Sequence, residues 1–385
     1  MHLPGKHSAK GTTIFTVMSA LAAEHNAINL SQGFPDFPVD EQLGVLLAEA
    51  VAKGFNQYSP MAGLPILRDA IASDFQKRYG VAVDATNEIT VTPGATYAIY
   101  TAFTSILQKG DEVIVLEPAY DSYIPNIETN GAIVVPVALT APGYTVDWNK
   151  VQSAVTSKTK AIIVNTPHNP TGAVWKKEDW DKLAAIVRDT DIIVLSDEVY
   201  EQQVFDGRQH HSVLQHEELR ARSFAIYSFG KVYHNTGWKM GFVIAPPALT
   251  DAFRSIHQFL CFSVNTPAQY ALAQYLSQPV LPDVSNMMQR KRDYFLDLLQ
   301  QTPFTVHQPA GGSYFQTVGY SNISDMPDTE FAKWLTKEYG VATIPISVFY
   351  SNKQDDKIIR FCFAKKEETI QAAIEKLALI KAPVL

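Results

Sequence analysis

The stretch "DIIVLSDEVYE" (Asp191 to Glu201) joins an apolar, β-branched run to a group of acidic residues and a tyrosine. Continuously apolar runs of this length are typical of strands that are covered on both faces, as in parallel sheets. An unpaired carboxylate at the end of such a strand costs free energy, so Asp197 needs a cation or hydrogen bonds. Tyr200 lies close enough in sequence to reach the same pocket. The alternative is that Asp197 only caps the following turn.

Similar runs recur on both sides of this stretch, and helix-like segments such as 95–107 and 177–189 lie between several of them. This alternation predicts an α/β domain with a mostly parallel sheet. After about residue 247, long amphipathic helices dominate, which indicates a smaller α+β domain. The other runs expected as covered strands are 112–116, 132–137, 160–164, 224–228 and 241–245. The later helices are expected at 248–261, 266–277, 284–300, 328–339 and 366–380, and the later strands near 304–307, 313–318 and 358–363.

Composition narrows the class of protein. Of 385 residues, 46% are hydrophobic and 18% are charged, which is ordinary for a soluble globular enzyme. The net charge is 32 − 39 = −7 and no basic block occurs, so we expect neither a nucleic-acid nor a membrane partner. The two cysteines, Cys261 and Cys362, have no metal-ligand spacing. We therefore expect a reduced, cytoplasmic protein without a metal site.

The N-terminus raises the question of a signal peptide. Lys6 and Lys10 precede the apolar run 14–23, which has roughly the length of a signal sequence. Two hydroxyl residues interrupt the run, and a polar "EHN" follows it. We prefer an amphipathic helix capped by Thr12 or Thr13.

Two loops that follow predicted strands contain chemically useful groups. Residues 92–96, "TPGAT", open a helix with small residues and a hydroxyl, which suits an anion because free N–H groups and the helix dipole both favour it. The alternative is an ordinary glycine turn. Residues 165–172, "NTPHNPTG", form a proline-rigidified loop that would hold Asn165 and Asn169 in place. The alternative is again a simple turn.

A third loop, "SFGKVYHNTGWKMG" (228–241), places Lys231 after an apolar strand. A lysine in a partly desolvated place has a lowered pKa and can act as a nucleophile. Together, an anion site, a carboxylate, a phenol, an amide and a reactive lysine fit pyridoxal phosphate (PLP). This cofactor forms a Schiff base with a lysine, and an acidic group partners its pyridinium nitrogen.

With these motifs the chain resembles the fold type I PLP-dependent aminotransferases of class I/II. Within that family it is similar to the bacterial methionine aminotransferases and the kynurenine aminotransferase/glutamine transaminase K group. The resemblance extends from "INLSQGFPDFP" to "IIRFCFAKKEE". It implies a large PLP-binding domain (36–278) with a mostly parallel seven-stranded sheet between helices. It also implies a small C-terminal α+β domain (279–385). An N-terminal arm (1–35) would contribute to this small domain.

The resemblance also implies roles for single residues. Lys231 would form the Schiff base and carry the proton between the substrate Cα and the cofactor. Asp197 would pair with the pyridinium nitrogen, and Tyr200 and Asn169 would hydrogen-bond the phenolic oxygen. Tyr120 would stack on the pyridine ring. The phosphate would be bound by Ala95, Thr96, Ser228 and Lys239, and by Tyr58 from the neighbouring subunit of a homodimer.

The resemblance further implies a substrate pocket. Arg360 would hold the substrate α-carboxylate in a bidentate fork, assisted by the backbone at Gly33 and the amide of Asn169. Phe15 and Phe262 look like apolar walls of the pocket. The region around Phe262 lacks the arginine with which aspartate aminotransferases bind a side-chain carboxylate, which favours an apolar or aromatic donor. Many family members have arginine at the position of Lys239. The kynurenine aminotransferase-like branch is similar to this chain in having lysine there.

The sequence therefore predicts a ping-pong aminotransferase. It would move the amino group of an apolar, sulfur-containing or aromatic L-amino acid (methionine, kynurenine, glutamine or phenylalanine type) to a 2-oxo acid. A PLP-dependent cysteine-S-conjugate β-lyase would use the same residues and remains the alternative. A regulator module is disfavoured because only about 30 residues precede "SQGFPDF". A dehydrogenase is disfavoured because no GxGxxG follows a strand.

Overall fold

The structure is a computed structural model that describes residues 12–381. Lys6, Lys10 and the first part of the predicted N-terminal arm lie outside the described residues. The apolar run of the N-terminus forms helix α1 (Ile14–Glu24), and its cap is Thr13, whose Oγ1 accepts from the backbone N of Thr16 at 3.3 Å. Between residues 12 and 381, no helix is both long and apolar enough to cross a membrane.

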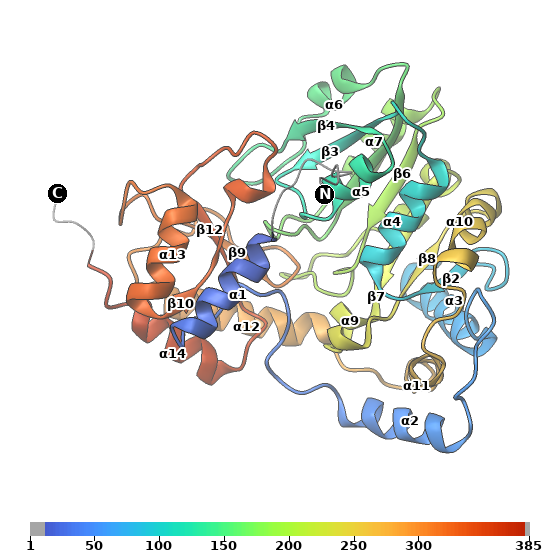
Figure 1. Cartoon of the computed structure of the whole chain (residues 1–385), viewed down its shortest axis with the longest axis horizontal. Coiled ribbons are helices and arrows are strands. Elements are labelled where there is room, and N and C mark those ends of the chain that lie inside the picture. Colours follow the sequence, from blue (N-terminus) through green and yellow to red (C-terminus); the bar gives the residue numbers. More distant parts are fainter. Residues whose placement is uncertain (1–11, 382–385) are drawn as a thin grey trace, which may run out of the picture.

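A seven-stranded sheet forms the centre of the larger part of the molecule (Figure 1). All neighbouring strands are parallel except β8, which runs antiparallel to both of its neighbours. This confirms the predicted α/β class and the mostly parallel seven-stranded sheet. The strands, in spatial order, are β2 (Ile89–Thr92), β8 (Gly241–Ile244), β7 (Ser223–Ser228), β6 (Ile193–Asp197), β5 (Thr159–Asn165), β3 (Glu112–Glu117) and β4 (Ile133–Ala138).

Strand β4 departs from the expectation for a covered strand. It is the last strand of the sheet and pairs only with β3. Most of its side chains are partly or fully exposed, and Ile133 is 50% exposed. The prediction that the run 132–137 is covered on both faces is therefore wrong, because an apolar run does not distinguish an edge strand from a central one.

Helices cover both faces of the sheet because alternate strand residues point to opposite sides. One face packs against α4, α5 and α10, and the other against α3, α7 and α11. The bounds of the helices on this part are α2 (Glu41–Ala52), α3 (Pro65–Tyr79), α4 (Ala95–Ile106), α5 (Tyr123–Thr129), α6 (Trp148–Ala154), α7 (Lys177–Val187), α8 (Glu217–Arg220), α9 (Phe229–Val232), α10 (Pro247–Leu260) and α11 (Thr266–Leu276).

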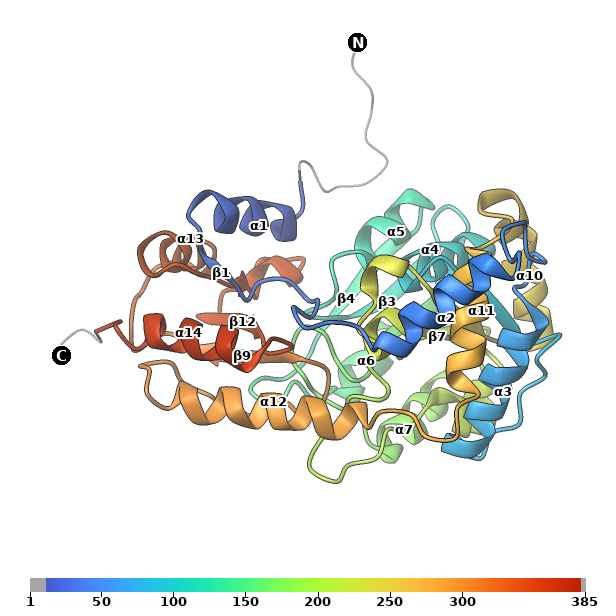
Figure 2. The same cartoon turned by 90° about the horizontal axis from the view of Figure 1, so that it is seen from below.

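A second group of elements lies at one end of the molecule, as Figures 1 and 2 show. Its antiparallel sheet has the order β11-β12-β9, and a short parallel pair joins β1 to β10. The strand expected near 304–307 is wrong, since Thr305 forms only an isolated bridge with Gly319. The elements are β1 (Ile28–Asn29), β9 (Phe315–Gly319), β10 (Val341–Ala342), β11 (Ile344–Pro345), β12 (Ile358–Cys362), α12 (Val284–Leu299), α13 (Asp328–Tyr339) and α14 (Glu367–Leu377), together with α1.

The change of sequence texture near residue 247 does not coincide with this second group. Helix α10 packs on α4, and α11 packs on α2 and α3, whereas α12 packs on α14. The first two helices of the helix-rich half thus cover the large sheet. The division at 35/36 and 278/279 stays a prediction.

We expect the core beneath α3 to dominate the stability of the large part. Ile71 on α3 is 1% exposed, and Ile66 on the same helix is 42% exposed. Ile71→Ala removes buried methylene groups and leaves a cavity, so it should lower the free energy of unfolding by about 2–5 kcal/mol. Ile66→Ala is the matched control and should change it little. Urea unfolding measures both, and equal losses would contradict the packing described.

Candidate active site

Three neighbouring strands end at one edge of the sheet and bring the predicted loops together. Asn165 and Asp197 are aligned as the last residues of β5 and β6, and Ser228 is the last residue of β7. In open α/β sheets, ligands bind beyond these carboxyl ends. The loops that the sequence analysis selected therefore meet at the expected edge.

Asp197 is held by hydrogen bonds and not by a cation. Its Oδ2 accepts from the hydroxyl of Tyr123 at 2.6 Å and its Oδ1 from the backbone N of Val199 at 3.3 Å. Burial raises the pKa of Asp197 to about 6, although both hydrogen bonds act in the opposite direction. A cationic group placed beside it would stabilise the ionised form. Tyr123 escaped the sequence analysis, although it stands three positions after Tyr120 in "EPAYDSY".

The proline-rich loop holds its asparagines as predicted from its rigidity. Asn165 accepts at Oδ1 from the backbone N of Asn169 at 2.7 Å and donates to the carbonyl of Asp197 at 2.8 Å. Asn169 is buried, and its Oδ1 accepts from Nη1 of Arg360 at 2.8 Å. This contact fixes the orientation of the amide. The side-chain NH₂ of Asn169 is then the group that can donate to a ligand.

Lys231 is partly buried, and its amine has two hydrogen-bond partners. Its Nζ donates to the carbonyl oxygen of Gly33 at 3.1 Å and to the hydroxyl of Tyr314 at 3.0 Å. Burial lowers the pKa of Lys231 to about 8. An appreciable share of neutral amine is therefore present near neutral pH, as a nucleophile or a general base requires.

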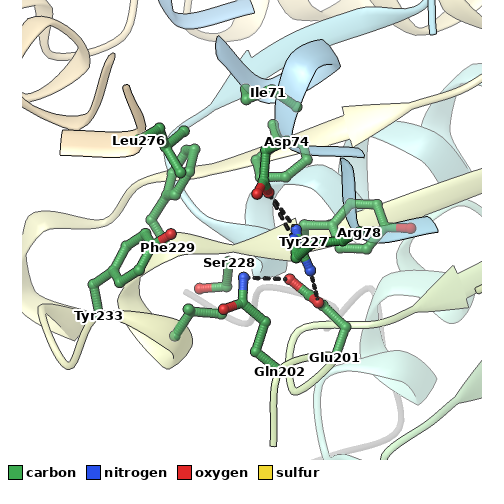
Figure 3. A pocket seen from close by; sticks show the side chains of 12 residues that line it. Ile71, Asp74, Arg78, Glu201, Gln202, Tyr227, Ser228, Phe229, Tyr233 and Leu276 are labelled. Carbon is green, nitrogen blue, oxygen red and sulfur yellow. Dashed lines mark hydrogen bonds and ion pairs between the residues drawn. The ribbon is translucent and has the colours of Figure 1, made fainter. Parts of the chain in front are cut away.

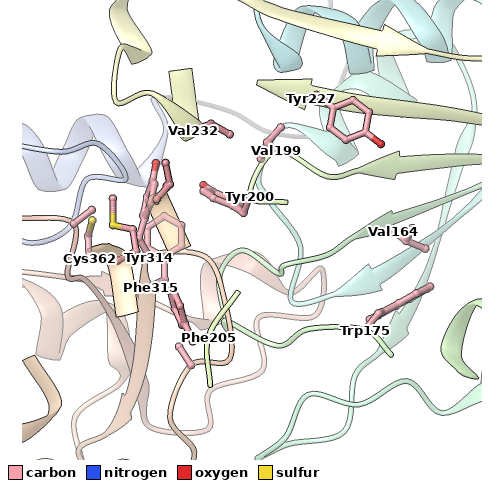
Figure 4. Close-up of a cluster of buried hydrophobic side chains, with 14 of the residues drawn as sticks. Val164, Trp175, Val199, Tyr200, Phe205, Tyr227, Val232, Tyr314, Phe315 and Cys362 are labelled. Atoms are coloured by element: carbon pink, nitrogen blue, oxygen red, sulfur yellow. The ribbon is translucent and has the colours of Figure 1, made fainter. Parts of the chain in front are cut away.

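Aromatic rings close the space between the large sheet and β9 (Figure 4). The ring centroids of Tyr200 and Tyr314 are 5.0 Å apart, and the Tyr314 hydroxyl donates to the carbonyl of Gly33 at 2.6 Å. Phe315 packs against both tyrosines. A strand was predicted at 313–318, but no role was predicted for Tyr314 or Phe315, because the residues that they contact are remote in sequence.

Arg360, on β12, is fully buried and has no acidic partner. It donates from Nη1 to Asn169 and from Nη2 to the carbonyl of Ser31 at 2.8 Å, while its Nε has no hydrogen-bond partner. None of the ion pairs among residues 12–381 includes it. Burial lowers its pKa to about 10. A buried cation with an unsatisfied N–H suits a carboxylate ligand.

The guanidinium of Arg360 is surrounded by aromatic side chains. The ring centroids of Phe315, Phe15 and Phe349 lie 3.9, 5.3 and 5.5 Å from its central carbon. Phe15 thus lies where the sequence analysis expected a pocket wall, and Phe349 is an additional wall that it missed. A ligand bound to this arginine meets apolar surface around its charged end.

The first turn of α4 forms a second anion-binding candidate. Gly94 precedes the helix with a φ of 86° and no side-chain cap, so the N–H groups at Ala95 and Thr96 face no capping side chain. The positive φ favours glycine at this position, and a Cβ built there would lie 3.4 Å from Nζ of Lys239, so the ammonium lies close to the start of the helix. Lys239 is exposed and belongs to no ion pair of the described chain. Ser228 is the last residue of β7 and pairs with Gly241 at the start of β8.

The three remaining predicted residues, Tyr120, Tyr58 and Phe262, do not lie in one place. The ring of Tyr120 contacts that of Tyr123 at 5.7 Å, close to Asp197. Tyr58 is 82% exposed and its ring contacts Phe262, which is 51% exposed, at 5.5 Å. Among residues 12–381, neither Tyr58 nor Phe262 has a ring or hydrogen-bond contact with Arg360 or the rings around it.

A partly buried cluster of charged residues anchors the loop that follows β6 (Figure 3). Arg78 on α3 donates to Asp74 and to Glu201, and Glu201 follows directly after Tyr200. Farther along, Gln203 donates from Nε2 to the backbone oxygen of Lys231 at 2.7 Å. This loop is thereby fixed to α3 on one side and to the lysine-bearing segment on the other.

The chain is similar to proteins of known class over nearly its whole length. A family model for aminotransferase class I and II matches residues 25–377. The chain belongs to the aminotransferase class I and II family. A methionine aminotransferase of Escherichia coli (strain K12) is 48% identical to it over 372 residues, covering 95% of both proteins. The human kynurenine–oxoglutarate transaminase 1 is 35% identical over 393 residues, covering 93% of both.

A solved structure leads to the same family. An Escherichia coli protein identified as having a methionine aminotransferase function superposes with a TM-score of 0.95 at 46% identity, covering 98% of this chain and 99% of that one. The resemblance to class I/II aminotransferases and the enzyme class that it implies are confirmed. The roles of single residues stay predictions.

We expect the hydroxyl of Tyr123 to keep Asp197 ionised to lower pH. Tyr123→Phe removes a donor that lowers the pKa of Asp197, so this pKa should rise further above about 6 and the proton should remain bound to higher pH. Infrared titration of the protonated carboxyl band, assigned with Asp197→Asn, measures it. Tyr97→Phe is the control, since that hydroxyl pairs with His257. An unchanged midpoint in Tyr123→Phe would contradict the expectation.

Proposed function

We propose that this aminotransferase uses PLP to move the amino group of an apolar, sulfur-containing or aromatic L-amino acid to a 2-oxo acid. The observation that carries the proposal is the pairing of two groups. Arg360 is a buried cation without an acidic partner, walled by aromatic rings, and Lys231 offers an amine with a pKa of about 8. The similarity to methionine and kynurenine aminotransferases supports the substrate class.

The residues at the strand ends fit the parts of PLP. The uncapped start of α4 and the exposed ammonium of Lys239 suit a phosphate. Asp197 lacks a cation and suits a protonated ring nitrogen. The free NH₂ of Asn169 and the hydroxyl of Tyr200 suit a phenolic oxygen. The full set that we assign to PLP is Ala95, Thr96, Tyr120, Asn169, Asp197, Tyr200, Ser228, Lys231 and Lys239, with Tyr58 from a neighbouring subunit.

When bound, PLP supplies an electron sink that makes the Cα–H of the amino acid acidic enough to transfer. Lys231 would hold the cofactor covalently until the substrate amine replaces it. Its Nζ would take the proton from the substrate Cα and later return one, which a pKa of about 8 permits near neutral pH. The carbonyl of Gly33 and the hydroxyl of Tyr314 hold the amine when it is free.

Arg360 would orient the substrate through its α-carboxylate. The amide of Asn169 fixes one end of the guanidinium and the carbonyl of Ser31 fixes another, so the fork is held before the substrate arrives. Phe15 lies beside this fork and would contact the substrate side chain, and the backbone at Gly33 would assist in binding. An apolar or aromatic side chain suits this lining better than a second carboxylate would.

We further propose a homodimer whose partner completes the site. The exposed rings of Tyr58 and Phe262 contact one another, and Phe259 and Leu260, which closely precede Phe262 in the sequence, are 88% and 48% exposed. An apolar surface of this kind is typical of a protein interface. In this arrangement Tyr58 reaches the phosphate and Phe262 the pocket of the neighbouring subunit. A cytoplasmic location remains a prediction.

Substitutions of Lys231 and Lys239 should have different effects on PLP binding. Lys231→Ala should abolish covalent attachment of PLP, read as the mass of the Lys231 peptide after borohydride reduction, and should abolish turnover. Lys239→Ala should keep the covalent label at saturating PLP but weaken PLP retention by roughly tenfold, measured by equilibrium dialysis. Lys239→Arg is the control and should retain PLP, since it keeps the charge. A label lost in Lys239→Ala and kept in Lys231→Ala would reverse the assignment.

The substrate class is tested by a panel of amino donors. Methionine, phenylalanine, kynurenine and glutamine should convert the PLP spectrum to that of pyridoxamine phosphate at least tenfold faster than aspartate does, because no second cation contacts the pocket wall at Phe15. A 2-oxo acid should restore the original spectrum. If none of these donors gives the conversion, transamination is wrong. Pyruvate and ammonia released from a cysteine S-conjugate without an acceptor would instead support the β-lyase alternative.

A further inference from the structure

The end of strand β3 contains a buried carboxylate that the proposed reaction does not use. Glu117 is the last residue of β3 and is 3% exposed. It belongs to no ion pair among residues 12–381, and burial raises its pKa. A buried acid is costly unless it is hydrogen-bonded, so its partners define its role.

Those partners belong to a segment more than two hundred residues later. Both oxygens of Glu117 accept from the backbone N of Ser351, at 3.0 and 3.1 Å, and Oε2 also accepts from its hydroxyl at 3.0 Å. Two residues after Glu117, the backbone N of Ala119 donates to the carbonyl of Phe349 at 2.9 Å. The end of β3 is thus joined to the turn 349–351 by a pair of adjacent contacts.

This turn supplies one of the aromatic rings around Arg360. The ring of Phe349 lies 5.5 Å from the guanidinium carbon of Arg360 and 6.0 Å from the ring of Phe15. On the other side of the contact, the chain runs from Glu117 directly into Tyr120, the residue assigned to the PLP ring face. The Glu117–Ser351 contact therefore connects the segment assigned to the cofactor with the segment that lines the substrate pocket.

A chemically equivalent pair lies nearby, within the second group of elements. Asp328, which is 2% exposed, accepts from the backbone N of Ser347 at 2.7 Å and from its hydroxyl at 2.6 Å. Both pairs join a buried carboxylate to the N–H and hydroxyl of one serine. They differ in what they connect, because Asp328 begins α13 and lies on the same side of the pocket as Ser347.

We propose that Glu117 is a positioning residue for substrate binding: through Ser351 it holds Phe349 against Arg360 and so sets the affinity for the amino donor. This inference rests on the proposed function. It assigns Glu117 no contact with substrate or PLP. Loss of the contact should act on recognition of the carboxylate and side chain of the donor, while Lys231 and the groups assigned to PLP keep their places.

The experiment compares Glu117→Gln and Ser351→Ala with Asp328→Asn and Ser347→Ala in the full-length enzyme loaded with PLP. Glu117→Gln turns an N–H group toward the donors of Ser351. The KM for methionine should rise roughly tenfold, the effect of losing one charged hydrogen bond, with kcat changed less than about twofold. Ser351→Ala keeps the backbone donor and should give a smaller rise. The matched pair Asp328→Asn and Ser347→Ala should lower the melting temperature but raise KM less than Glu117→Gln does, because it leaves the contact between the two groups of elements in place.

A second measurement separates binding from chemistry. The compound 4-(methylthio)butanoate is methionine without its amino group, so it offers the carboxylate and side chain but cannot react. Its Kd, measured by calorimetry, should rise in Glu117→Gln by the same factor as the KM, while PLP retention stays that of the unmodified enzyme. An unchanged Kd and KM in Glu117→Gln would overturn the inference, as would equal rises in the Asp328 and Ser347 variants. If the unmodified enzyme transaminates no amino acid, the proposed function fails instead.

Discussion

A guanidinium that is buried without an acidic partner is the constraint on which the site depends. Removing such a cation from water costs several kcal/mol, and Arg360 recovers only part of this from the amide of Asn169 and the carbonyl of Ser31. Its Nε has no partner. The residues that hold it come from the loop after β5, from the segment after β1, and from β12 itself. One unsatisfied cation thus requires both parts of the molecule to meet at the same place.

The same cation acts on Lys231. Burial is the main cause of the lowered pKa of Lys231, and the positive charge of Arg360 adds to it. The carbonyl of Gly33 and the hydroxyl of Tyr314 keep the amine in place without neutralising it. The arrangement therefore provides a permanent cation for a carboxylate and, beside it, an amine that gives up its proton near neutral pH. Two basic side chains acquire different chemistry because their environments differ.

The sequence was sufficient for the parts of the fold and site that local pattern determines. Apolar runs identified most strands of the large sheet, and the strand ends that precede the predicted loops, at Asn165, Asp197 and Ser228, lie at one edge of that sheet. The Thr13 cap and helix α4 were likewise local. An apolar run did not reveal that β4 is an edge strand, since that depends on which strands lie beside it.

The residues that the sequence did not reveal are those whose partners are remote. Tyr314 meets Lys231 from 83 positions away, and Glu117 meets Ser351 from 234 positions away. Neither residue type is unusual for a strand or strand end, so no periodicity or motif marks it. What distinguishes them is the contact between the two groups of elements. Only the folded structure shows which carboxylate or hydroxyl lies at that contact.

The lysines of "SFGKVYHNTGWKMG" illustrate how position decides function within a single segment. Lys231 lies on α9, where the carbonyl of Gly33 and the rings of Tyr200 and Tyr314 surround its amine. Lys239 follows the η2 turn (Thr236–Trp238) with a left-handed φ of 55°, which turns the chain toward Gly94 and leaves the residue exposed. A phosphate needs a cation that stays charged, and a proton carrier needs an amine that does not. The two lysines are eight positions apart, yet one amine is enclosed by a carbonyl and two rings while the other residue is exposed, and this difference is the basis for proposing an anchor and a base.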